Sequence, residues 1–144
     1  MINYRYRIVE KLGEGGSGEV FQVEDTLKKN QVLAIKILHS AEKIGSAGDE
    51  AFRNEVSQLI KLSHPNLVRI FDFGIVRHAQ EDFLLHRRFF TMEFVKGVDA
   101  LQWVTSNVHP QKKEALLEVL LLQALSVLDY VHREGIIHFD VKPQ

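Results

Sequence analysis

Four glycines near the start of the chain are the first residues whose type and spacing could do chemistry. They lie in the segment Gly13-Glu14-Gly15-Gly16-Ser17-Gly18-Glu19-Val20, and glycines let a backbone approach phosphate oxygens that a side chain would keep away. Similar spacing occurs in dinucleotide-binding turns, which must open a helix. Here Val20-Phe21-Gln22-Val23 follows and favours a strand. The sequence therefore indicates a phosphate-covering loop between two strands, or an ordinary glycine-rich hairpin.

Lys36 is the second candidate, because it lies inside an apolar run of residues. Period-two alternation places Ala34, Lys36 and Leu38 on one face of a predicted strand. A charged amine in such a run costs free energy unless it is paired. Glu55, central on the next predicted helix, is the partner that we expect, and Glu50 is a rival one turn earlier. The alternative is an edge-strand lysine with its amine in water.

A third candidate stands at the end of the chain, where His138-Phe139-Asp140-Val141-Lys142-Pro143 follows the short apolar run Gly135-Ile136-Ile137. The segment combines a histidine, a carboxylate and an amine within five residues. This is the most specific local pattern in the sequence. A surface loop with unrelated charges is the alternative interpretation.

The elements that must position these residues fall into a strand-rich part and a helical part. Apolar and β-branched residues predict strands over 6–12, 20–23, 32–38, 67–73 and 88–95. A helix is predicted over 49–62, with Phe52, Val56 and Leu59 on one side, and His64-Pro65-Asn66 ends it. Further helices are predicted over 98–107 and from Pro110 to about residue 133, with Gly135 ending the second.

Composition excludes several classes of function. The net charge of −1 gives no electrostatic case for nucleic acid or an acidic membrane surface. The absence of cysteine excludes disulfides and thiolate metal sites. The N-terminus lacks the apolar run of a signal peptide, and the apolar stretch 115–131 is interrupted by polar residues. We therefore expect no membrane span and a cytoplasmic location.

In order and spacing, the three motifs resemble those of the protein kinase family, and a lysine two residues after Asp140 resembles its Ser/Thr branch. The resemblance covers essentially all 144 residues, but only about the first half of a kinase domain. It implies an α+β fold: a small lobe over 1–96, with a five-stranded antiparallel sheet and one helix, then the first helices of an incomplete large lobe over 97–144. It also implies ATP and Mg²⁺ as cofactors and a protein as substrate.

The resemblance assigns roles in nucleotide binding by position. Lys36 holds the α- and β-phosphates and pairs with Glu55 in the active arrangement. Met92 is the gatekeeper behind the adenine pocket, and Asp99 lies where the family often has an acidic residue for the ribose. The full set is Leu12, Gly13, Gly15, Gly18, Val20, Ala34, Lys36, Glu55, Met92, Glu93, Val95 and Asp99. Glu93 and Val95 contribute backbone groups to adenine, and Val20 lies above the base.

For phosphoryl transfer, the resemblance implies that Asp140 accepts the proton of a substrate hydroxyl and that Lys142 neutralises the moving phosphate. Phe139 departs from the family, which most often has an arginine there that grips a phosphate on the activation loop. Asp72-Phe73-Gly74 spells the family's magnesium-binding tripeptide but precedes Asp140, so we interpret it as a strand end and turn, without metal. The metal ligands are expected beyond Gln144.

Three interpretations follow from these motifs. The first is the N-terminal part of a Ser/Thr protein kinase, with residues 1–144 inactive alone because the metal ligands are missing. The second is a nucleotide-binding or regulatory module without catalysis, and the third a small-molecule kinase of the same fold, which the Asp140-Val141-Lys142-Pro143 run disfavours. The predicted helix over 111–133 is apolar around most of its circumference, so we also expect self-association.

Overall fold

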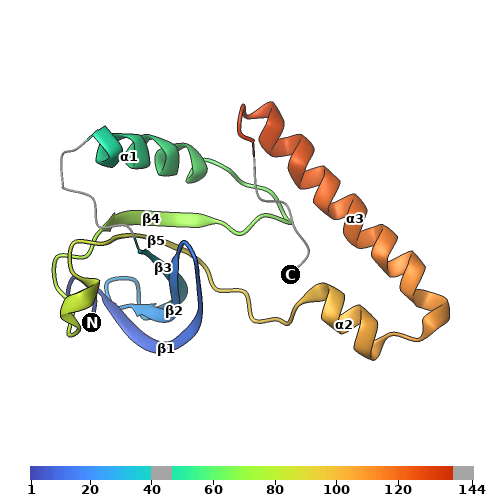
Figure 1. The fold of residues 1–144 in the computed structure, drawn as a ribbon, viewed down its shortest axis with the longest axis horizontal. Coiled ribbons are helices and arrows are strands. Elements are labelled where there is room, and N and C mark those ends of the chain that lie inside the picture. Colours follow the sequence, from blue (N-terminus) through green and yellow to red (C-terminus); the bar gives the residue numbers. More distant parts are fainter. Residues whose placement is uncertain (40–46, 138–144) are drawn as a thin grey trace. The chain divides into compact units, whose positions relative to one another are not determined.

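The computed structural model describes residues 1–39 and 47–137 of the chain and divides it into two compact units (Figure 1). The first unit comprises Met1–Leu62 and Val68–Phe94. The second comprises Ser63–Leu67 and Val95–Gln144. The chain leaves the first unit after Leu62 and again after Phe94.

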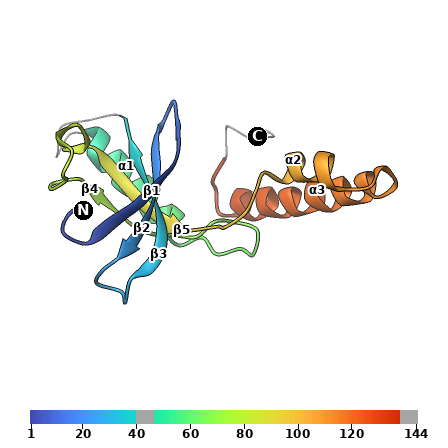
Figure 2. The ribbon, with the colours of Figure 1, turned by 90° about the horizontal axis from the view of Figure 1, so that it is seen from below.

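The first unit is built on a five-stranded antiparallel sheet in the order β1-β2-β3-β5-β4 (Figures 1 and 2). The strands are β1 (Tyr6–Gly15), β2 (Gly18–Asp25), β3 (Gln31–Leu38), β4 (Ile70–Ile75) and β5 (Arg88–Glu93). A short 3₁₀ turn, η1 (Asp82–Leu84), precedes β5. The five-stranded antiparallel sheet expected from the sequence is therefore confirmed.

One face of this sheet carries the hydrophobic core. The fully or nearly fully buried side chains are Ile2, Tyr6, Phe21, Val23, Leu33, Ile35, Ile37, Val76, Leu84 and Phe89. Tyr6 and Phe89 meet edge to face, with ring centroids 5.8 Å apart, the arrangement that aromatic quadrupoles favour. Alternation along β3 places Lys36 on the face opposite Ile35 and Ile37.

The first residues of the chain are fastened to the segment that follows β4. Ile2 and Tyr6 form an isolated antiparallel bridge. The Asn3 side chain donates to the carbonyl of Ile75 at 2.8 Å and accepts from the amides of Arg77 and His78 at 2.7 and 3.1 Å. These bonds close the core at the end of β4, because they satisfy backbone groups that the sheet leaves unpaired.

One helix, α1 (Ala47–Leu59), belongs to the first unit. As the sequence predicted, Val56 is buried and Phe52 is half-buried on the same side. The Phe52 ring meets Phe73 of β4 edge to face at 6.1 Å and lies 5.1 Å from the guanidinium carbon of Arg88 on β5. Phe52 therefore attaches the helix to the two strands at one edge of the sheet.

The second unit contains α2 (Ala100–Asn107) and α3 (Pro110–Arg133). Asp99 caps α2, its carboxylate accepting from the Gln102 amide at 2.7 Å. Pro110 opens α3, and Gly135 ends it with a φ of 76° that favours glycine. The two helices pack against each other and line an apolar groove of about 310 Å³ with Trp103 and Leu116 among its walls.

The segment 63–67 is bound to the C-terminal half of α3. The Ser63 amide donates to the Tyr130 hydroxyl at 3.0 Å, and the His64 ring stacks on Tyr130 with centroids 5.4 Å apart. Since His64 Nδ1 accepts from the Asn66 amide at 3.1 Å, its Nε2 carries the proton and donates to Ser126 Oγ at 3.2 Å. His64 thus has a structural role in this unit.

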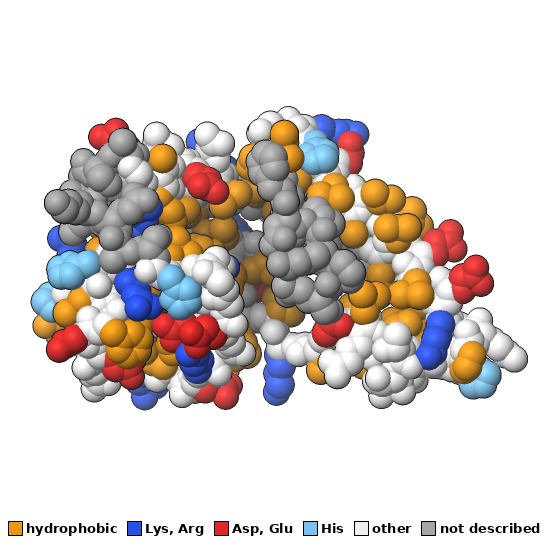
Figure 3. Space-filling view, viewed as in Figure 1, with side chains coloured by type: hydrophobic (Ala, Val, Ile, Leu, Met, Phe, Trp, Pro, Cys, Tyr) orange, Lys and Arg blue, Asp and Glu red, His pale blue; other side chains and the backbone are white. Residues whose placement is uncertain are grey.

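Much of α3 is apolar and exposed. Its more exposed apolar side chains are Leu117, Val119, Leu121, Leu122 and Leu125, and hydrophobic side chains gather along this helix in Figure 3. By length and composition alone α3 could cross a membrane, with a mean hydropathy of 1.5. That is weak evidence, because core helices of soluble domains have the same composition.

Candidate nucleotide site

The glycine segment forms a tight hairpin between β1 and β2. Gly15 pairs with Gly18 across a turn at Gly16 and Ser17, and Gly13 pairs with Val20. The space beside the backbone differs among these glycines. A Cβ on Gly18 would lie 2.3 Å from the Ile37 carbonyl oxygen. A Cβ on Gly13, Gly15 or Gly16 would meet no atom within 4 Å. Packing within the protein therefore requires glycine at 18 but leaves open space beside the other three.

Lys36 lies under this hairpin, on the sheet face opposite the core. It pairs with Val20 across β2 and β3, and Ala34 pairs with Met92 across β3 and β5. Of these four residues, Ala34 is buried and the other three are half-buried. The structure thus brings four of the residues predicted to bind nucleotide onto one face. Leu12 precedes Gly13 on β1 and is exposed.

Glu55, the predicted partner of Lys36, lies on α1 with its side chain exposed. Among the described residues no ion pair joins Lys36 to Glu55. The rival, Glu50, is also exposed on α1. The Lys36–Glu55 pair, which the resemblance associates with the active arrangement, stays a prediction for that arrangement.

Glu93, Val95 and Asp99 follow the sheet. The Glu93 amide donates to the Arg69 carbonyl at 2.8 Å, so that N–H is used within the first unit. Val95 is exposed and belongs to the second unit, as does Asp99, which caps α2. The adenine and ribose contacts of these three residues stay predictions.

The predicted transfer residues Asp140 and Lys142, and the unusual Phe139, lie outside the described residues. Within residues 1–39 and 47–137, no group of three or more His, Asp or Glu side chains could hold a metal ion. The sheet face that carries Lys36 offers the apolar side chains of Val20, Ala34 and Met92 and the amine of Lys36. These groups suit a base and a negatively charged group.

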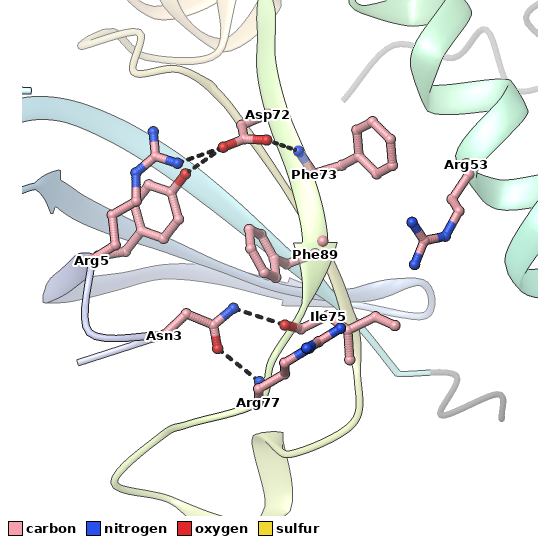
Figure 4. Close-up of a pocket in the computed structure, with 10 residues that line it drawn as sticks. Asn3, Arg5, Arg53, Asp72, Phe73, Ile75, Arg77 and Phe89 are labelled. Atoms are coloured by element: carbon pink, nitrogen blue, oxygen red, sulfur yellow. Dashed lines mark hydrogen bonds and ion pairs between the residues drawn. The ribbon is translucent and has the colours of Figure 1, made fainter. Parts of the chain in front are cut away.

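Asp72 makes contacts of a different kind, as Figure 4 shows. Its carboxylate accepts from Arg5 Nη1 at 2.7 Å and from the Tyr6 hydroxyl at 3.1 Å. Burial, with the nearby Asp72 carboxylate, raises the pKa of Tyr6 well above its usual range. Asp72-Phe73-Gly74 lies near the end of β4 as predicted, but the predicted turn is wrong, because the strand continues through Gly74 to Ile75. Asp72 is a sheet residue that anchors β1.

Asp72 also lines a pocket between the start of the chain, β4 and α1, with a volume of about 310 Å³; Figure 4 draws the residues of its walls. Arg5, Arg53 and Arg77 contribute to its walls. The pocket's lining contains none of the residues predicted to bind nucleotide. It is a separate feature of the first unit.

Sequence reasoning missed a charged cluster behind the hairpin. Glu19 is buried and accepts from Lys11 Nζ at 2.8 Å and from Arg87 Nη1 at 3.2 Å. Lys11 also donates to Glu14 at 2.7 Å, and this bond raises the pKa of Lys11 and lowers that of Glu14. The one signal in the sequence was a glutamate next to the last glycine, which does not identify partners that come from β1 and from the segment before β5.

Comparison with known proteins gives a consistent result. The protein kinase domain family matches residues 6–144. The chain is 36% identical over 140 residues to the probable serine/threonine-protein kinase PknB of Lactococcus lactis, and 33% identical over 142 residues to the serine/threonine-protein kinase PrkC of Bacillus subtilis. These alignments cover 97% and 99% of this chain but 21% and 20% of the relatives. The chain therefore spans about a fifth of the length of these relatives.

The fold comparison agrees. A crystal structure of the Mycobacterium tuberculosis PknI kinase domain, in a mutant form, matches with a TM-score of 0.74 at 25% identity. The match covers 99% of this chain and 54% of that kinase domain. Together with the glycine hairpin and the lysine beneath it, these matches show that the chain belongs to the protein kinase family.

Proposed function

We propose that this chain supplies the ATP-binding part of a Ser/Thr protein kinase. The observation that carries the proposal is the position of Lys36, half-buried on the same sheet face as Val20 and directly across from it. A cation there can meet phosphates held beneath the hairpin, and Ala34 and Met92 on the same face offer apolar contacts to a base. Three of the four hairpin glycines have open space beside them, which leaves room for a ligand.

In the complete enzyme, we propose that the chain's residues divide the work of transfer. Lys36 binds the α- and β-phosphates, Asp140 accepts the proton of the substrate hydroxyl, and Lys142 binds the phosphate as its charge moves. Magnesium supplies further charge neutralisation when bound, through residues that we expect outside this sequence. We therefore propose that residues 1–144 alone bind nucleotide without appreciable transfer.

The test is calorimetric binding of Mg-ATP and of adenosine to the protein. A hydrogen bond to a charged group contributes about 1.5–3 kcal/mol, so Lys36→Ala should weaken ATP binding about tenfold or more and leave adenosine binding nearly unchanged. Lys28→Ala, in the exposed turn before β3, is the matched control. Failure of the unsubstituted protein to bind ATP, or an equal loss in both variants, would overturn the proposal.

A nucleotide-binding module without catalysis is the second candidate. Phe139 favours it, because phenylalanine cannot supply the phosphate grip that the family's arginine commonly supplies. The two functions separate in an assay of the full-length protein with a generic Ser/Thr substrate. Transfer that is lost on Asp140→Ala supports the kinase, whereas nucleotide binding with no transfer supports the module.

A further inference from the structure

The back of the glycine hairpin carries a buried carboxylate. Glu19 follows Gly18 on β2 and pairs with Ile37 of the core, so it faces away from Val20 and Lys36. Only 7% of Glu19 is exposed. A buried carboxylate requires compensating cations, and Lys11 and Arg87 supply them at 2.8 and 3.2 Å. The hairpin is therefore bound on the side opposite the predicted nucleotide.

His39 binds the tip of the same hairpin. Its ring Nε2 lies 3.0 Å from the Gly15 carbonyl oxygen, and its amide donates to the Ser17 carbonyl at 3.2 Å. Arg87 Nη1 lies 3.5 Å from His39 Nδ1. Since arginine can only donate, Nδ1 accepts and Nε2 carries the proton that is donated to Gly15. One side chain thus connects the turn of the hairpin to Arg87.

Arg87 joins these contacts to the segment before β5. Its guanidinium carbon lies 5.5 Å from the centre of the Phe83 ring in η1, a cation–π distance. Its carbonyl accepts from the Val76 amide at 2.9 Å, which fixes its backbone beside the end of β4. The side chain is 19% exposed. Both the backbone and the guanidinium of Arg87 are therefore fixed by contacts with the rest of the unit. The guanidinium can then restrict the motion of the hairpin through Glu19 and His39.

We propose that Arg87 and His39 are positioning residues that hold the glycine hairpin over the phosphates of the nucleotide. This inference rests on the proposed function for the identity of the ligand. A glycine-rich turn loses much conformational entropy when it closes on a ligand. Bonds that order the turn beforehand reduce that loss and so favour binding of the part of the ligand that the turn covers.

If Arg87 and His39 only stabilised the fold, the expected effect of their removal on binding would be different. The Arg87–Glu19 pair is largely buried, with side chains 19% and 9% exposed, so its removal costs stability. A loss of stability would weaken every ligand of the site alike. A positioning role affects the phosphates selectively, because the predicted base contacts lie outside the hairpin tip at residues 15–18. They come from Val20 on β2, Ala34 on β3 and the residues on and after β5. Comparing a ligand with phosphates to one without them therefore separates the two roles.

The experiment compares binding of Mg-ATP and adenosine to Arg87→Leu, His39→Leu and His39→Gln. We expect both leucine variants to bind Mg-ATP at least fivefold more weakly and adenosine within twofold of the unsubstituted protein. His39→Gln should retain most of the affinity, because its amide can donate to Gly15. Arg7→Leu, which removes the exposed Arg7–Glu24 pair of the same two strands, is the matched control and should change neither affinity.

Hydrogen exchange of the amides of residues 16–18 supplies a readout that does not depend on nucleotide. We expect exchange there to accelerate at least fivefold in Arg87→Leu and His39→Leu and to stay unchanged in Arg7→Leu. Unchanged exchange, or equal weakening of ATP and adenosine, would overturn the positioning role. If the unsubstituted protein binds no ATP, the proposed function fails, and faster exchange in the leucine variants would still support the hold on the hairpin.

Discussion

Arg5 binds Asp25 through two parallel hydrogen bonds, from Nε to Oδ1 at 3.0 Å and from Nη2 to Oδ2 at 2.7 Å. The Asp25 side chain is fully buried, and Arg5 is 24% exposed. This bidentate geometry is the strong form of a carboxylate–guanidinium pair. Arg5 also reaches Asp72 on β4, so a single guanidinium joins the end of β2 to the far edge strand.

Removing the Asp25 charge should therefore destabilise the first unit. Asp25→Asn leaves part of the Arg5 guanidinium uncompensated and replaces one acceptor with a donor. We expect a loss of about 3 kcal/mol in the free energy of unfolding, measured by urea denaturation. Glu24→Gln, which affects the exposed pair with Arg7, is the control and should cost less than about 1 kcal/mol. A similar cost for both variants would contradict the importance of burial.

Low pH should also remove the contribution of the Asp25 charge to the free energy of unfolding. The hydrogen bond from Arg5 lowers the pKa of Asp25 below its ordinary value of 3.8. The folded state thus holds the carboxylate charged more strongly than the unfolded state does. Its contribution is present above the unfolded pKa and is lost as pH falls below about 4 and through the folded pKa. The free energy of unfolding, measured from pH 7 to pH 3, should fall less in Asp25→Asn than in the unsubstituted protein.

The hairpin glycines should respond differently to alanine. Gly18→Ala places a methyl group against the Ile37 carbonyl oxygen, and we expect a cost of about 1–3 kcal/mol in unfolding free energy. Gly16→Ala meets open space and should change stability by no more than about 0.5 kcal/mol. Thermal unfolding of the two variants tests this. Equal destabilisation would show that the close approach at Gly18 does not control its packing.

The apolar face of α3 should cause self-association of residues 1–144. Leu121 and Leu125 lie one turn apart and are 59% and 51% exposed. We expect oligomers in sedimentation velocity at tens of micromolar, and a shift toward monomer in Leu121→Glu/Leu125→Glu. Glu118→Gln on the same helix is the control. A monomeric profile of the unsubstituted chain would refute the expectation.

Under the proposed function, activity of the full-length protein should not depend on a phosphate gripped by the residue before Asp140. Phe139 occupies that position and offers no cation. We expect phosphatase treatment to leave most of the activity in place, as measured with a generic Ser/Thr substrate. A large loss of activity after treatment, restored by rephosphorylation, would count against this.

The sequence predicted the type and order of the elements because their apolar residues follow strand and helix periods clearly. Strand ends were less accurate at glycines. β1 continues to Gly15 and β2 begins at Gly18, although glycine has low strand propensity, because the ladder between the strands continues to the turn. β4 likewise continues through Gly74, where the sequence indicated a turn.

The candidate nucleotide site also has parts that the sequence could predict and parts that it could not. Ala34 and Lys36 could be placed on one face of a strand from alternation alone, whereas Val20 joins them through the register of β2 with β3. The contacts of Glu19 could not, because its partner Arg87 is 68 residues away in sequence and only strand order brings them together. The exposed position of Glu55 was also beyond reach, since it depends on how α1 packs against β4 and not on the spacing within the helix.

The attachment of Asn3 to the segment after β4 has a mechanical consequence. Tension applied at Met1 reaches the hydrogen bonds of Ile2 with Tyr6, the first residue of β1, and the bonds of Asn3 with the end of β4 and the segment after it. Those bonds carry the load in parallel and so share it. The two edge strands of the sheet, β1 and β4, therefore resist a pull on the first residues together.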